Sequence, residues 1–98
     1  MHSEEKILSD FRERIESVVR GPHAPVFVRM AAGGTTDYGV RHHVASKVFT
    51  LAQLRDTANR LEWFGVSSMT KAMLLPSLLE SAYQFCNDGS LPQTEVVK

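Results

Sequence analysis

The sequence predicts an α+β fold that is mainly helical, with three helices and a short β-hairpin between the first and the second. Three stretches repeat apolar residues at helical spacing, and one stretch between the first two alternates apolar and polar residues as a strand does. The chain has 98 residues, of which 43% are hydrophobic and 22% are charged. This length and composition fit one domain, 1–98, with an ordered core over residues 4–87 and a flexible tail over 88–98.

The first helix is expected over residues 4–20, because its apolar side chains gather on one side of a helical wheel. Ser3 is a suitable N-cap, and Glu4 and Glu5 suit the positive end of the helix dipole. Gly21 is expected to end the helix. The apolar side consists of Ile7, Leu8, Phe11, Ile15, Val18 and Val19.

A β-hairpin is expected next, with strands over residues 26–30 and 38–44, the second able to continue to Val48. Both segments are rich in β-branched and aromatic residues, and residues 33–37 have the composition of a turn. A two-stranded hairpin is marginal by itself, so we expect it to pack on the helices or to pair with another chain.

The second helix begins with the clearest local signal in the chain. Thr50 as N-cap and Gln53 three residues later form a capping box, and Phe49 and Leu54 occupy the two positions of a hydrophobic staple. The helix is expected to end at Gly65. Its apolar side consists of Leu51, Leu54, Ala58, Leu61 and Phe64.

A last helix is expected from Ser67 or Ser68 to about Asn87, kinked or split near Pro76. Its apolar side covers roughly 200° of the wheel, about twice the width found on an ordinary surface helix. A chain of this size has few elements with which to enclose such a helix. We therefore expect its ridge to be buried in a homodimer or partner interface. The alternative is a central core helix wrapped by the hairpin and the first helix. The ridge residues are Leu74, Leu78 and Phe85.

Trp63 lies off the apolar stripe of the second helix. Exposed tryptophans are frequent at binding hot spots, so we expect it to contact a partner. The alternative is that the helix frays near Gly65 and Trp63 folds back over its own core. The expected partner-binding residues are Trp63, Met69, Met73, Leu74, Leu78, Tyr83 and Phe85.

Charge and chemistry-bearing residues disfavour several classes of function. Eleven basic residues balance eleven acidic ones, which argues against a bulk nucleic-acid or membrane-surface binder. No apolar run is long enough to span a membrane, and the N-terminus lacks the apolar region of a secretory signal. The lone cysteine, Cys86, suits a reducing cytoplasm. His42 and His43 would point to opposite faces of a strand, and no nucleophile–base arrangement stands out. We expect no catalytic site, no metal and no cofactor.

Residues 44–85 resemble a ribbon-helix-helix DNA-binding domain. A strand, a helix, the tight link Gly65–Ser68 and a second helix follow one another in the order of that family. The resemblance implies a DNA-binding transcription regulator whose paired strands enter the major groove. In this alternative hypothesis, Arg41 and Lys47 contact nucleic acid.

In its length, its predicted helical content and its neutral charge, the chain also resembles small bacterial anti-activators. Proteins of that class bind LuxR-type quorum-sensing regulators and stop them from dimerising or reaching DNA. The resemblance implies a non-enzymatic regulatory protein that binds a transcription activator through an apolar helical surface. This is the leading functional hypothesis from the sequence.

Overall fold

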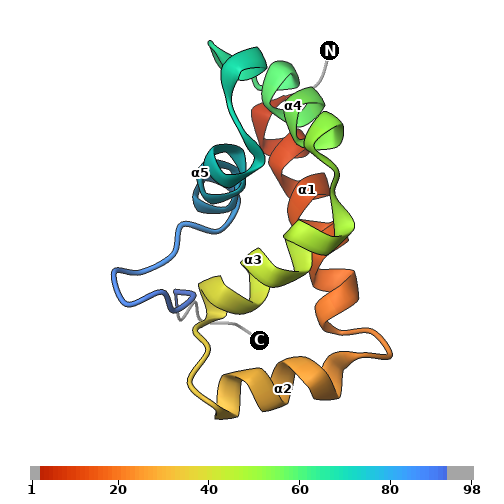
Figure 1. The fold of residues 1–98 in the computed structure, drawn as a ribbon, viewed down its shortest axis with the longest axis vertical. Helices are drawn as coiled ribbons and strands as arrows, with labels where there is room; N and C mark the ends of the chain where they lie inside the picture. The colour runs from red at the N-terminus through yellow and green to blue at the C-terminus, as the bar shows by residue number, and fades with distance from the viewer. Residues whose placement is uncertain (1–2, 93–98) are drawn as a thin grey trace.

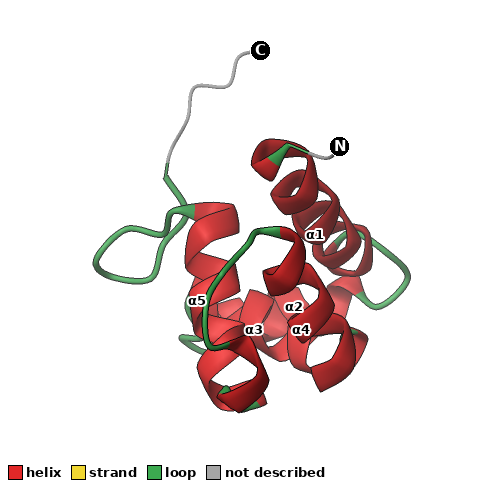
Figure 2. Ribbon diagram, turned by 90° about the horizontal axis from the view of Figure 1, so that it is seen from above, coloured by secondary structure: helices red, strands yellow, loops and turns green. Residues whose placement is uncertain are grey.

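The structure is a computed structural model that describes residues 3–92. Its regular elements are all helices (Figure 1), so the predicted α+β class is wrong. Helices and loops account for everything described in residues 3–92, without a strand (Figure 2). No helix in this part of the chain has both the length and the apolar character to cross a membrane. The elements are α1 (Glu4–Val19), α2 (Ala24–Ala32), α3 (Asp37–Val48), α4 (Leu51–Arg60), the 3₁₀ turn η1 (Val66–Ser68) and α5 (Lys71–Tyr83).

Helix α1 confirms the first predicted helix and its cap. The Ser3 side chain accepts a hydrogen bond from the Lys6 backbone N–H at 3.1 Å, which satisfies one of the free donors of the first turn. Its buried residues are Ile7, Phe11 and Ile15, all of which belong to the predicted apolar side.

The first predicted strand, residues 26–30, is instead the middle of helix α2. Pro25 stands in the first turn, where its missing N–H removes no helical hydrogen bond. The expected hairpin turn closes this helix as a Schellman motif. Thr35 N–H donates to the Met30 carbonyl at 2.9 Å and Gly34 N–H donates to the Ala31 carbonyl at 3.0 Å. Gly34 has φ 105°, a value that favours glycine.

The second predicted strand, residues 38–48, is helix α3. The Thr36 side chain caps it by accepting from the Gly39 N–H at 3.0 Å. Val40, Val44 and Val48 are spaced by four, which suits an alternating strand and a helix stripe equally well. Val40 and Val44 are buried, and Val48 packs against the core. The segment is a helix because packing buries one of its helical faces. The local sequence pattern does not predict this burial.

Helix α4 has the predicted capping box. Thr50 accepts from the Gln53 N–H at 3.2 Å, and the Gln53 side chain accepts from the Thr50 N–H at 2.8 Å. Phe49 and Leu54, the predicted staple residues, are both buried in the main core cluster. The helix ends at Arg60, five residues before Gly65. Phe64, which was predicted on the apolar side, therefore lies outside the helix and is exposed.

Helix α5 is the centre of the molecule. Helices α1, α3 and α4 all pack against it, and Leu74, Leu75, Leu78 and Leu79 are buried. The core-helix alternative therefore describes this element, with α3 in the position given to the hairpin. The helix starts after Thr70, ends at Tyr83 and continues through Pro76 without splitting.

The segment after α5 returns to the start of α3. The Gly89 carbonyl accepts from the Tyr38 N–H at 2.9 Å, and the Asp37 carboxylate accepts from the Leu91 N–H at 3.1 Å. Residues 88–92 of the expected tail thus have defined partners, whereas residues 93–98 lie outside the described part of the chain.

The position of Leu78 predicts a large loss of stability on truncation. Leu78 is 0% exposed within a single chain, so Leu78→Ala should lower the free energy of unfolding by about 2–5 kcal/mol. Met73→Ala, at a site that is 52% exposed on the same helix, is the matched control and should cost less than about 1 kcal/mol. Urea denaturation followed by circular dichroism measures both. Equal unfolding midpoints for Leu78→Ala and the wild type would contradict the internal position.

Candidate partner-binding surface

Large apolar side chains are exposed at two ends of the molecule. Phe64 is 97% exposed and Met73 52% exposed, both in or beside the connection between α4 and α5. Val26 and Val28 are exposed on α2. Along the long axis of the molecule, this connection and α2 lie at opposite ends (Figure 1). The two exposed regions are therefore separate surfaces.

The backbone of the connection turns Phe64 outward. Glu62 has φ 63° and Gly65 has φ 71°, so a left-handed residue stands on each side of the Trp63–Phe64 pair. A left-handed conformation costs a residue with a Cβ about 1–2 kcal/mol. Glu62 N–H donates to the Asn59 carbonyl at 2.9 Å and Trp63 N–H donates to the Ala58 carbonyl at 3.1 Å, which hold this geometry.

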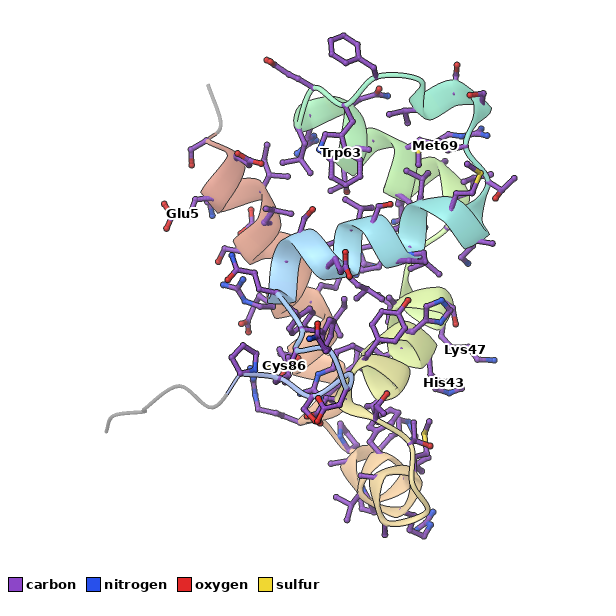
Figure 3. All side chains as sticks on the ribbon, turned by 90° about the vertical axis from the view of Figure 1, so that its left-hand side faces the viewer. Glu5, His43, Lys47, Trp63, Met69 and Cys86 are labelled. Carbon is purple, nitrogen blue, oxygen red and sulfur yellow. The ribbon has the colours of Figure 1, made fainter. Side chains whose placement is uncertain are left out.

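Trp63 faces inward, as the alternative to a partner contact expected. Its side chain is partly buried against the core cluster, and the indole points toward α5 (Figure 3). Trp63 thus takes the inward position that the helical wheel gave to Phe64. The wheel failed because it extended α4 to Gly65. The left-handed residue that closes α4 is Glu62, and a glutamate at this position gives no sequence signal that a helix ends there.

The remaining predicted partner-binding residues divide between the core and the surface. Leu74 and Leu78 are fully buried and Tyr83 is nearly so. Phe85 is partly buried and lies against Tyr83 and Tyr38, with ring centroids 5.2 and 5.3 Å apart. The predicted ridge is therefore internal. We define the connection surface as the solvent-facing part of Trp63, Phe64, Met69 and Met73.

A partly buried ion pair joins α1 to α3. Arg41 donates two hydrogen bonds to the Glu16 carboxylate, from Nε at 3.0 Å and from Nη2 at 3.1 Å. The Tyr83 hydroxyl of α5 donates to the same carboxylate at 2.6 Å. The two charged side chains are 13% and 17% exposed, so this pair is largely removed from solvent. Three helices are tied together at one carboxylate.

This arrangement changes the protonation of its members. Burial by itself would raise the pKa of Glu16, but the hydrogen bonds from Arg41 and Tyr83 outweigh it and lower that pKa. Burial and the hydrogen bond to the Glu16 carboxylate raise the pKa of the Tyr83 hydroxyl strongly. The ionised carboxylate is thus the form that the fold selects.

The two residues of the DNA-binding hypothesis do not act together. The Arg41 guanidinium is held by Glu16 and also lies 3.6 Å from the Asp37 carboxylate. Lys47 is exposed and points away from the bundle beside His43 (Figure 3). The strand that would carry Lys47 into a DNA groove is helical. No paired basic surface is formed by these two residues.

Metal-ligating side chains do not gather at one place in residues 3–92. This part of the chain has no cluster of three or more His, Cys, Asp or Glu side chains. An open hollow of about 740 Å³ lies beside Leu8, Arg12 and Tyr83. Two of its three charged side chains serve the fold, since Arg12 donates to the Ala82 carbonyl at 2.8 Å and Glu16 binds Arg41. The connection surface remains the candidate functional site.

Comparison with known proteins returns no match: no family description, curated protein or solved structure is similar to the chain.

The lowered pKa of Glu16 predicts how stability depends on pH. Above the pKa that Glu16 has when unfolded, about 4.3, its ionised form contributes fully to stability; this contribution is lost as the pH falls through the lower folded pKa. At pH 7, Glu16→Gln should therefore lower the free energy of unfolding by about 1–3 kcal/mol. The difference from the wild type should shrink below about pH 4. Urea titrations at a series of pH values test this, and a difference that stays constant down to pH 3 would contradict it.

Proposed function

We propose that the chain is a non-enzymatic regulatory protein that binds a transcription activator through the connection surface, in the cytoplasm. Binding blocks the dimerisation or the DNA binding of the activator. The observation that carries this proposal is Phe64, a phenylalanine that is 97% exposed and held outward by its backbone. The ring contributes nothing to the core of its own chain, so its burial is available to a partner.

The physical argument for Phe64 as the anchor rests on apolar area. Transferring a phenylalanine side chain from water to an apolar pocket is worth about 1.5–3 kcal/mol. Aromatic anchors of this kind dominate protein interfaces. The turn that presents Phe64 is held by backbone hydrogen bonds, so little backbone entropy is lost when the ring is buried.

Met69 and Met73 give the connection surface an adaptable border. Methionine side chains are unbranched and repack against imperfectly matched apolar groups. Met73 is 52% exposed, and Met69 is partly buried. Such a border suits a protein that binds the apolar dimer interface of the activator and so prevents the activator from dimerising.

The formal charge of the chain supports a protein partner over a nucleic acid. The formal charge of the chain is zero, so it lacks the long-range attraction for phosphate on which DNA binding depends. A homodimer was expected because the α5 ridge was predicted to need a partner to bury it. The ridge is internal to a single chain, so it no longer supports a homodimer. The proposal therefore places the apolar contact with a different protein.

Phe64→Ser tests the proposal. The immobilised wild-type chain should retain a transcription activator from native cytosol, and the purified chain should release that activator from its DNA site in a mobility-shift assay. Phe64→Ser should weaken this effect by about tenfold or more, because the anchor is lost, and should leave the unfolding midpoint nearly unchanged because Phe64 packs on nothing.

Ala52→Ser is the control, since Ala52 is also exposed and apolar but lies on α4, outside both proposed surfaces. It should inhibit the activator as the wild type does. Equal inhibition by Phe64→Ser and the wild type would contradict the proposal. Retention of duplex DNA by the chain alone would favour the DNA-binding hypothesis instead.

A further inference from the structure

We propose a second interaction surface on α2, which binds in an apolar groove of a protein partner whose lining includes a carboxylate. This inference is independent of the connection surface. It begins from the composition of α2, in which eight of nine residues are non-polar and none is buried. A helix of this kind gains stability from a partner that removes its apolar side chains from water.

Helix α2 rests on the bundle along one narrow stripe. Its partly buried residues are Ala24, Phe27 and Met30, spaced three apart, and of the three Phe27 packs against the core cluster. The helix contacts α1 and α3 only, and it lies below them at the end of the molecule (Figure 1). Its exposed residues are Pro25, Val26, Val28, Arg29, Ala31 and Ala32.

The exposed residues surround the helix on three sides. On a wheel of 100° per residue, Val28, Ala32 and Pro25 form the outward stripe, and Val26 lies on one flank. Val28 is 67% exposed and Val26 is 41% exposed. Spacing of apolar residues at i, i+3 and i+7 is the pattern by which a helix lies in a groove.

The size of α2 selects a groove over a second copy of the same helix. Nine residues give a helix about 13 Å long and about 10 Å wide. A flat contact between two such faces buries far less than the roughly 800 Å² that each partner contributes to a stable interface. A groove covers the flanks as well as the outward stripe, so it buries Val26, Val28 and Ala32 together.

Arg29 defines the charge of the partner. It is the one charged residue of α2, it is exposed, and it makes no ion pair within residues 3–92. On the wheel it lies between Pro25 and Val26, inside the arc that the groove covers. A guanidinium in that position is matched by a carboxylate in the lining of the groove.

Site-specific photo-crosslinking of the full chain in native cell extract tests this inference. Benzoylphenylalanine replaces Val26, Val28 or Ala32 in three separate variants, and Ala52, exposed on α4, carries it in the control. All three α2 positions should give an adduct with the same protein, because a groove surrounds the helix. Adding Arg29→Glu should reduce these adducts by about tenfold, and adding Arg29→Lys should retain most of them.

Phe64→Ser in the same background should leave the α2 adducts unchanged, which separates this inference from the function proposed for the connection surface. Three results overturn the inference: a covalent dimer of the chain itself, an adduct from Val28 alone that Arg29→Glu does not reduce, and the absence of adducts at all three positions.

Discussion

Enclosing α5 is the constraint on which the rest of the structure depends. The helix is apolar over more than half of its circumference, and within residues 3–92 helices α1, α3 and α4 pack on it. Each of these helices gives its buried face to that task. Leu74, Leu75, Leu78 and Leu79 are consequently shielded within one chain. Helix α2 contacts α1 and α3 at one end of the bundle, and none of its residues is buried.

The same constraint explains why an aromatic ring is left in solvent. Two neighbouring aromatic residues, Trp63 and Phe64, follow α4, and the space beside α5 receives one of them. The larger indole packs there, where it covers more apolar area. The left-handed residues Glu62 and Gly65 let the chain reverse direction over a few residues, so Phe64 points the other way. The candidate site is thus a consequence of how the core is closed.

The Glu16 carboxylate joins the outer helices to the central one. Arg41 of α3 and Tyr83 of α5 both donate to it, and these polar groups are satisfied away from water. An arrangement of this kind is costly to leave half-satisfied, so it favours one relative position of the three helices. Arg41 is held by this carboxylate, so it does not join Lys47 in the basic pair that was expected to contact DNA.

The sequence by itself determined the local hydrogen bonds at the helix ends. It did not determine which residues are buried by contacts between segments far apart in the chain. The Ser3 cap, the Thr50–Gln53 capping box and the great apolar width of α5 all follow from residues close together in the chain. The sequence also predicted Met73 as a partner-binding residue. It placed Phe64 on the apolar side of the helix, because the exposure of Phe64 depends on where α4 ends. The sequence predicts strands for α2 and α3, because apolar residues four apart satisfy both periods. For α3, packing against α1 and α5 decides between the periods, because it buries Val40, Val44 and Ala45 on one helical face that no local pattern identifies.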